Sequence, residues 1–411
     1  MWIVEKILSN KIMNNNIFLK HLSSPSIFKD KKVLSSSFVP DQILHREQEI
    51  ESLSKILAPA LKGYQPNNIF VYGTVGTGKT ITIKFILNQL KEIEKTKIKT
   101  IYINCKMKKV ADTEYRLFAQ LLKEHGVIVP DTGLPTDVLY RKFFDIVEKE
   151  EKIVIIVLDE IDALVNKVGD EFLYNLTRMN SELKRSQITI IGITNNLSFR
   201  DNLDLRVKSS LGEEEVLFKP YNALQLKDIL KKRIEEGFNP GVVDEAVLNK
   251  CAAIAAQEHG DARRALDLIR VAAEIAERNG DIRVREEHVD IAEQKLDMDR
   301  VIETIKSQPK QSQAVLLAIV NSVCNGVCNN TKTVLTGDVF EAYQKICAKN
   351  NINVLTQRRI SDLISELDML GIITSKIISK GRYGRTREIT LALSNEVLNK
   401  VRLVLQERFE S

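Results

Sequence analysis

The first half of the chain alternates short, mostly apolar runs with longer stretches of helical spacing. The runs are strand-length and suited to burial on both faces of a sheet. They occupy residues 68–72, 99–104, 153–158 and 188–193. Apolar positions recur with helical periodicity in the stretches between them, chiefly at 80–90, 114–124 and 137–150. This alternation predicts an α/β fold with a parallel sheet and flanking helices.

The pattern changes after Pro220, where helical spacing continues without strands. Four helices are expected, at 224–236, 243–257, 261–278 and 284–296. A polar stretch at 307–312 is expected to be a linker or a helix start. Three further helices are expected at 313–325, 336–349 and 357–370, and two strand-like runs around a turn follow them. The second half therefore predicts a small all-α domain and then a domain of three helices with a hairpin.

The most specific motif lies between the strand at 68–72 and the helix that follows it. Its pattern is G-x-x-x-x-G-K-T, with the residues Gly73, Thr74, Val75, Gly76, Thr77, Gly78, Lys79 and Thr80. Glycines let the backbone N–H groups curl around nucleotide phosphates, and the helix N-terminus adds a favourable dipole. Lys79 suits the β- and γ-phosphates, and the Thr80 hydroxyl suits Mg²⁺. The motif predicts binding of ATP or ADP with Mg²⁺.

Acidic residues follow the buried strand at 153–158. Asp159 stands at the carboxyl end of that strand, at the sheet edge where ligands bind. We expect Asp159 to hold Mg²⁺ and Glu160 to polarise the attacking water, which hydrolysis needs and simple binding does not. Asp162 is expected to be a structural or supporting acid. Together with the phosphate loop, the pair predicts an ATPase.

The C-terminal domain has the features of a winged helix-turn-helix. Thr356 is an expected N-cap for the helix at 357–370, whose buried stripe is expected at Ile360, Leu363, Ile364, Leu367 and Leu370. Such a helix enters the major groove of DNA, and the hairpin contacts the backbone or the minor groove. The candidate DNA contacts are Gln357, Arg358, Arg359 and Ser361 on the helix and Lys380, Arg382, Tyr383, Arg385 and Arg387 on the hairpin. Winged helices also dock proteins, so this alternative stays open.

Charge supports a DNA partner. Residues 305–411 carry 15 Lys and Arg against 9 Asp and Glu, a net charge of +6, whereas the whole chain of 411 residues is +5. The basic surplus therefore belongs to the C-terminal domain, as nucleic-acid contact requires, although a merely solvated basic surface gives the same count. The chain has no apolar run long enough to span a membrane. The five cysteines form no C-x-x-C pair, which favours buried thiols in a reducing cytoplasm over a metal site at Cys324, Cys328 and Cys347.

With these motifs in place, the chain resembles AAA+ replication initiators of the archaeal origin-recognition and cell-division-control type. The likeness runs from about residue 26 to the C-terminus. It is carried by segments 27–34, 38–47, 73–80, 158–162, 192–196, 206–211, 260–268 and 381–386. It implies a flexible N-terminal segment at 1–25, an α/β nucleotide-binding domain at 26–222, an α-helical lid at 223–304 and a winged-helix DNA-binding domain at 305–411.

The resemblance implies further roles. Asn195 corresponds to the first sensor of the γ-phosphate, and Arg263 to the second sensor in the lid, although Arg264 is an alternative. Arg206 corresponds to the arginine that such ATPases offer to a neighbouring subunit's nucleotide. The segment at 38–47 resembles the part that covers the adenine. The remaining expected contacts are Val39, Arg46, Ile81 and Tyr221 with the nucleotide, and Lys108, Lys109 and Arg116, in an initiator-specific insertion, with DNA.

Two positions depart from the family pattern. Thr194-Asn195-Asn196 stands where relatives often have Ser-Asn-Asp, and Leu205 replaces a proline before Arg206. Asn195 and Arg206 are both kept. The loss of the proline before Arg206 therefore bears on hydrolysis at a neighbouring subunit's nucleotide more than on nucleotide binding.

The resemblance implies a cytoplasmic, nucleoid-associated initiator that binds duplex origin DNA and helps to recruit or load the replicative helicase. Other initiator subunits or paralogues on the same DNA are expected partners, and no membrane is. Slow ATP hydrolysis would act as a conformational switch. Two alternatives stay open, namely a paralogue that acts mainly as an ATP-liganded DNA-binding regulator, and an AAA+ machine whose winged helix docks protein.

Overall fold

The computed structural model describes residues 26–36, 38–94, 97–107, 111–130, 133–327, 333–379, 385–393 and 395–410. The expected flexible segment at 1–25 therefore lies outside the described residues. The chain forms two compact units, Met1–Asp290 and Ile291–Ser411. The domain bounds given above stay a prediction.

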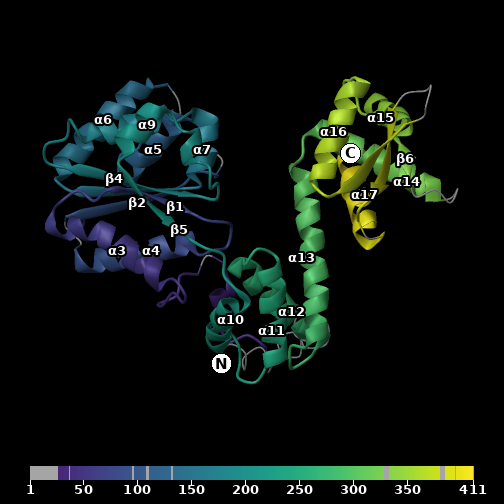
Figure 1. Ribbon diagram of the computed structural model, residues 1–411, viewed down its shortest axis with the longest axis horizontal. Coiled ribbons are helices and arrows are strands. Elements are labelled where there is room, and N and C mark those ends of the chain that lie inside the picture. The colour runs from purple at the N-terminus through teal and green to yellow at the C-terminus, as the bar shows by residue number, and fades with distance from the viewer. Residues whose placement is uncertain are drawn as a thin grey trace, which may run out of the picture. The chain divides into compact units, whose positions relative to one another are not determined.

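A five-stranded parallel sheet forms the centre of the first unit (Figure 1). Its strands are β1 (Asn68–Tyr72), β2 (Ile98–Asn104), β3 (Ile153–Asp159), β4 (Gln187–Thr194) and β5 (Glu213–Leu217), in the order β2-β3-β4-β1-β5. Every residue of β1 and β3 is buried, as their apolar sequences predict. The predicted α/β class is confirmed, and β5 is an additional edge strand.

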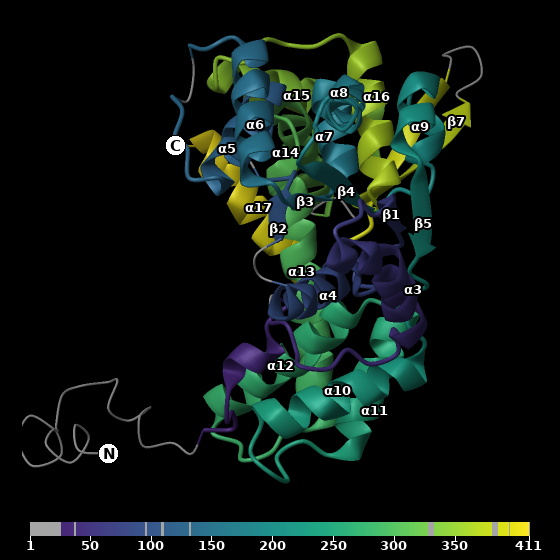
Figure 2. The same cartoon turned by 90° about the vertical axis from the view of Figure 1, so that its left-hand side faces the viewer.

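Helices cover both faces of this sheet and make a three-layer core (Figures 1 and 2). One face packs against α3 (Glu47–Leu57) and α4 (Lys79–Ile93) through residues such as Leu53 and Ile83. The other face packs against five helices through residues such as Phe118 and Phe143. These are α5 (Glu114–Glu124), α6 (Thr136–Glu150), α7 (Ile161–Val168), α8 (Glu171–Met179) and α9 (Leu205–Leu211). Both layers leave the carboxyl ends of the strands open for a ligand.

A helical lid follows the sheet within the same unit. It contains α10 (Ala223–Gly237), α11 (Glu245–Gln257), α12 (Ala262–Asn279) and the beginning of α13 (Glu286–Ser307). The segment before α3 runs along this lid, where the N–H groups of Lys29 and Asp30 donate to the Gly237 carbonyl at 2.9 and 3.1 Å. The Phe28 and Phe238 rings pack with centroids 5.1 Å apart. The segment before α3 is thus fixed to the lid before the chain enters the α/β core.

The second unit is a winged helix. Its helices are α14 (Lys310–Val327), α15 (Thr336–Lys349), α16 (Gln357–Met369) and α17 (Asn395–Glu410), and its strands are β6 (Val334–Leu335), β7 (Ile373–Ser379) and β8 (Arg385–Leu391). The antiparallel sheet has the order β6-β8-β7, which confirms the expected hairpin. Thr356 caps α16 by accepting from Arg359 N, as predicted. Leu370 is 44% exposed rather than buried, because it follows the last turn of α16 just before Gly371 adopts a positive φ.

Candidate nucleotide-binding site and DNA-contacting residues

The phosphate loop joins β1 to α4 and needs its glycines. Gly76 and Gly78 have φ angles of +74° and +89°, which L residues rarely adopt. A Cβ on Gly76 would lie 1.6 Å from Asp261 Oδ1, and one on Gly78 would lie 2.7 Å from the Tyr221 hydroxyl. Neighbouring side chains therefore approach the loop so closely that no other residue fits at these two positions.

Lys79 lies at the centre of the loop and is only 5% exposed. Its Nζ donates to the carbonyls of Gly73 and Thr74 and to Asn195 Oδ1, each at 2.7 Å. The pKa of Lys79 is lowered to about 8, chiefly by burial and next by the nearby Arg263 guanidinium. The carboxylates of Asp159, Asp261 and Glu160 oppose the shift in pKa. An anion beside Lys79 would stabilise its charged form, which is what a phosphate-binding lysine requires.

Two hydroxyl groups meet the Asp159 carboxylate at the end of β3, where the sequence predicts a magnesium site. Thr80 Oγ1 donates to Asp159 Oδ2 at 2.8 Å, and the Tyr102 hydroxyl donates to the same oxygen at 2.5 Å. A carboxylate beside a hydroxyl matches the oxygen ligands that Mg²⁺ prefers. Tyr102 was not predicted, although the pairing of Asn104 with Asp159 in adjacent strands places β2 beside this site.

Glu160 begins α7 with a positive φ of 55°. Its carboxylate forms an ion pair with Lys106 at 3.2 Å, a contact that the sequence did not indicate. Asp162 accepts from Thr194 Oγ1 at 2.8 Å, a contact that ties α7 to the end of β4. Glu160 lines the cavity beside the phosphate loop, while Asp162 holds the Thr194 side chain.

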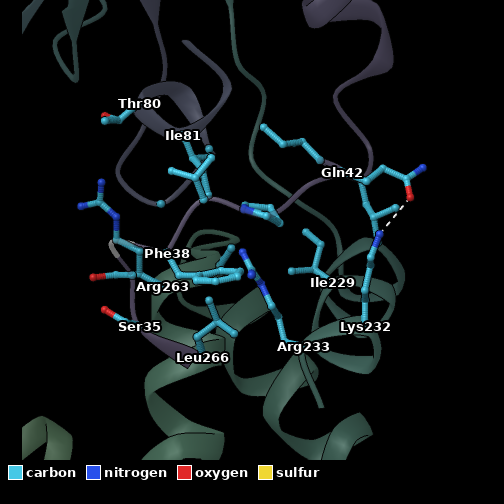
Figure 3. A pocket seen from close by; sticks show the side chains of 18 of the residues that line it. Ser35, Phe38, Gln42, Thr80, Ile81, Ile229, Lys232, Arg233, Arg263 and Leu266 are labelled. Carbon is cyan, nitrogen blue, oxygen red and sulfur yellow. Dashed lines mark hydrogen bonds between the residues drawn. The ribbon is translucent and has the colours of Figure 1, made fainter. Parts of the chain in front are cut away.

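A cavity of about 250 Å³ surrounds these groups, and Lys79, Thr80, Asp159, Glu160 and Asn195 all line it. A second cavity of about 140 Å³ adjoins it on the other side of the loop. The second cavity is largely apolar, as an adenine pocket would be. Its lining includes the predicted residues Val39, Ile81 and Tyr221 (Figure 3 shows part of this lining). Arg263 lines both cavities, as do Ser36, Gly76, Gly78 and Thr80.

Arg46 lies behind the phosphate loop and lines neither of these two cavities. Its Nε donates to the Thr77 carbonyl at 3.0 Å, and its Nη2 donates to the Lys219 carbonyl at 2.6 Å. The guanidinium stacks on Tyr221, 3.9 Å from the ring centroid. These contacts place Arg46 where it supports the phosphate loop and Tyr221, outside both cavities. Thr74 and Val75 likewise line neither cavity.

The lid contacts the loop through the start of α12. Asp261 caps this helix by accepting from Arg263 N at 2.8 Å, and Ala262 N donates to the Gly76 carbonyl at 3.2 Å. Of the two sensor candidates, Arg264 is engaged by Glu258 at 3.1 Å. Arg263 instead lines the cavities, which makes it the better candidate.

Arg206 lies on the surface at the start of α9, with 82% of its side chain exposed. Asp204 caps the helix by accepting from Arg206 N at 2.8 Å and pairs with its guanidinium at 3.2 Å. Asp204 therefore caps this helix without a proline at position 205. Arg206 lines neither nucleotide cavity of its own chain.

The structure places only some of the predicted DNA contacts. Gln357, Arg358 and Arg359 are exposed on α16, and Ser361 is half-buried on the same helix. Arg359 lies 3.4 Å from Glu366. Arg387 donates to Ser375 Oγ at 3.4 Å, and Arg116 pairs with Asp112 at 2.6 Å. Lys108, Lys109, Lys380, Arg382, Tyr383 and the side chain of Arg385 lie outside the described residues.

Membrane and metal features are limited. Among the described residues, no helix is both long and apolar enough to cross a membrane. In the same part of the chain, no cluster of three His, Cys, Asp or Glu residues could hold a metal ion. Cys347 is a buried free thiol, whereas Cys328 and the Cys324 side chain lie outside the described parts.

Family comparisons agree with this architecture. Residues 62–200 match the AAA domain, residues 227–294 the Cdc6 AAA+ ATPase-type lid domain, and residues 303–401 the CDC6 C-terminal winged helix domain. These matches identify an AAA+ ATPase with a C-terminal winged helix, as expected from the sequence.

Individual relatives cover almost the whole chain. An ORC1-type DNA replication protein of Pyrococcus furiosus is 51% identical over 97% of this chain and 94% of its own length. A homologous protein of Methanosarcina mazei is 47% identical over 95% of this chain and 93% of its own. The structure of Aeropyrum pernix ORC1 in complex with DNA aligns with a TM-score of 0.79 and 43% identity, covering 93% of this chain and 97% of that one. The chain therefore belongs to the family of ORC1-type DNA replication proteins.

Proposed function

We propose that this protein is a replication initiator that binds duplex origin DNA under the control of ATP. One observation carries the proposal: the phosphate-loop lysine, the acidic end of β3, Asn195 and the lid residue Arg263 meet around one pair of cavities. A basic winged helix in the same chain supplies a surface for DNA. The DNA-bound state of the Aeropyrum relative supports this assignment.

Each part of the site has a proposed task. Lys79 and the loop N–H groups bind the phosphates, and Thr80 and Asp159 would hold Mg²⁺, which supplies charge neutralisation when bound. Glu160 orients and deprotonates the attacking water, while Asn195 positions the γ-phosphate. Arg263 contacts the same phosphate from the lid, and Val39, Ile81 and Tyr221 enclose the base. Arg206 reaches the nucleotide of a neighbouring subunit.

Hydrolysis would be slow and would act as a switch. Contacts that exist only while the γ-phosphate is present favour one lid position, and their loss releases it. The bond between Ala262 N and the Gly76 carbonyl provides a direct connection from the loop to the lid. We further propose that the DNA-bound protein assists in recruiting or loading the replicative helicase and acts in the cytoplasm at the nucleoid.

DNA contact is proposed for two faces. On the winged helix, Gln357, Arg358, Arg359 and Ser361 would enter the major groove, while Lys380, Arg382, Tyr383, Arg385 and Arg387 would follow the backbone or minor groove. In the α/β core, Lys108, Lys109 and Arg116 would add a second contact. Most of these side chains are cationic, so binding should weaken steeply as salt rises.

The test is retention of genomic duplex fragments by the purified protein across a salt series, with ATP or ADP. We expect selective retention of origin fragments, a steep salt slope and a nucleotide dependence that Lys79→Ala abolishes. Retention of promoter fragments instead would favour a DNA-binding regulator. An absence of duplex binding at low salt would make the winged helix a protein-docking module and would overturn the proposal.

A further inference from the structure

The apolar cavity contains a buried charge that the proposed function does not use. Arg233, on the lid helix α10, lines the cavity and is only 7% exposed. Its guanidinium carbon lies 4.8 Å from the centre of the Phe38 ring, and Figure 3 shows the two side chains side by side. Its Nη1 is buried without a hydrogen-bond partner. Among the described residues, no carboxylate forms an ion pair with it.

Such an arrangement is unfavourable without a ligand. An arginine stays charged in proteins, so it cannot escape burial by losing its proton. Burial lowers the pKa of Arg233, and Glu236 opposes this only in part. The stacking on Phe38 offsets some of the lost hydration but leaves the Nη1 donor unsatisfied. A ligand in the cavity that offers an acceptor would complete the site.

The position of the cavity identifies the part of the ligand that would meet Arg233. Gly78 and Ile81 of the phosphate loop and α4 form one wall, so a nucleotide held by its phosphates would place its base here. Apolar side chains such as Phe38, Ile43 and Leu266 form much of the remaining lining. Polar side chains, among them Gln42, Lys84 and Lys232, also line the cavity. A purine ring fits such walls, and its ring nitrogens are hydrogen-bond acceptors.

Glu236 adds the complementary group. It lies three residues after Arg233 on α10, so both side chains are on the same side of the helix, and both line the cavity. Adenine presents an acceptor nitrogen next to the donor N6 amino group, which matches a guanidinium beside a carboxylate. Guanine presents the acceptor O6 at the position of that amino group, and an acceptor there would face the Glu236 carboxylate.

We propose that Arg233 and Glu236 select adenine in the bound nucleotide, with Arg233 donating to a ring nitrogen and Glu236 accepting from the N6 amino group. This rests on the proposed nucleotide site. Since both residues belong to the lid, the base as well as the phosphates would then join the lid to the core.

The test compares the affinities for ADP and GDP of the full-length protein and its variants, measured by calorimetry. Arg233→Met should weaken ADP binding by about 10- to 100-fold, the cost of losing a hydrogen bond to a charged group. Glu236→Gln should lower the preference for ADP over GDP by about tenfold or more. Lys231→Met, an exposed position on the same helix, is the matched control and should change neither value.

The unfolding temperature separates adenine selection from a structural role for Arg233. If Arg233 selects adenine, Arg233→Met without nucleotide should unfold at the same or a higher temperature than the parent, because an unpaired buried charge is removed. A structural role predicts a lower unfolding temperature instead. The increase in unfolding temperature on adding ADP should shrink. If Arg233→Met fails to fold, Arg233→Lys and Glu236→Gln provide the same comparison.

The outcomes separate the two proposals. Unchanged ADP affinity and ADP-over-GDP preference in the Arg233 and Glu236 variants, with binding still abolished by Lys79→Ala, would overturn only the adenine-selection proposal. A parent protein that binds neither ADP nor GDP would instead overturn the nucleotide site and this inference with it.

Discussion

Lys79 is expected to couple nucleotide binding to proton uptake, because its pKa of about 8 lies below the ordinary lysine value. Phosphate groups favour the charged ammonium and should raise the pKa again. At pH 8.5 to 9, ADP binding should therefore take up a fraction of a proton, and affinity should fall with rising pH by at most about tenfold per unit. Calorimetry in two buffers of different ionisation enthalpy measures this uptake. At pH 6.5 Lys79 is already charged and should take up no proton, so the uptake should disappear or turn into release from the terminal phosphate of ADP. Equal uptake at both values would contradict the assignment to Lys79.

Glu160 is predicted to act in hydrolysis and to contribute little to binding. Glu160→Gln keeps the size of the side chain and removes the base, so ATP affinity should stay within about threefold while turnover falls about 10²- to 10⁴-fold. Lys106→Met is the matched comparison, because Lys106 is the ion-pair partner of Glu160 and is largely exposed. Exposed ion pairs contribute little, so its turnover should remain near the parent value. Phosphate release at saturating ATP measures both, and a fully active Glu160→Gln would rule out this role.

At the residue scale, the sequence predicts groups whose spacing along the chain is fixed by chemistry. The phosphate loop and Asp159 are of this kind, since both follow buried strands and meet at one sheet edge. Tyr102 and Arg233 are not, because their positions depend on the pairing of β2 with β3 and on how the lid meets Phe38. A tyrosine in a strand and an arginine in a polar helix carry no local signal of such contacts.

The hairpin of β7 and β8 is the element for which DNA contact is predicted most directly. Replacing Arg382 and Arg385 together by alanine should weaken duplex binding and reduce the salt slope by about 2, one for each lost phosphate contact. The control replaces Lys400 and Arg408 on α17, which removes the same charge from another element of the same unit. Fluorescence anisotropy across a salt series gives both slopes. A hairpin variant whose salt slope equals that of the parent protein would exclude the hairpin from the interface.

Element boundaries follow the sequence closely where capping and burial agree. The helix α16 begins after Thr356, as predicted, and β3 ends at Asp159, one residue beyond the predicted strand at 153–158. The strand β5 was not predicted, since its three consecutive glutamates look like a solvated loop. It forms because β1 offers a free edge and Arg200 pairs with Glu213 and Glu215 at 2.8 and 3.0 Å. Long-range contacts of this kind are absent from local sequence patterns.

For the whole protein, the nucleotide site is a meeting point of three segments. The segment before α3 contributes Phe38 and Val39, the core contributes the phosphate loop, and the lid contributes Arg263. The segment before α3 is itself hydrogen-bonded to the lid at Gly237, so the lid and this segment are expected to move together. A nucleotide would thus hold together parts that are far apart in the sequence, which is what a switch requires.

The last prediction concerns assembly on DNA, because Arg206 is exposed and lines neither cavity of its own chain. If it completes the site of a neighbouring subunit, Arg206→Ala should lower turnover of the DNA-bound protein by about 10³-fold or more while keeping ATP affinity. Arg185→Ala, which removes another largely exposed arginine of the same unit, should have little effect.

Mixing distinguishes action between subunits from action within one. Lys79→Ala has a dead site but an intact Arg206, and Arg206→Ala has an intact site but no arginine. Neither variant should hydrolyse ATP alone, whereas a mixture on origin DNA should recover part of the parent rate, because the first can supply its arginine to the second. A mixture as inactive as its components would show that Arg206 does not act between subunits, and would leave hydrolysis to the groups of a single chain.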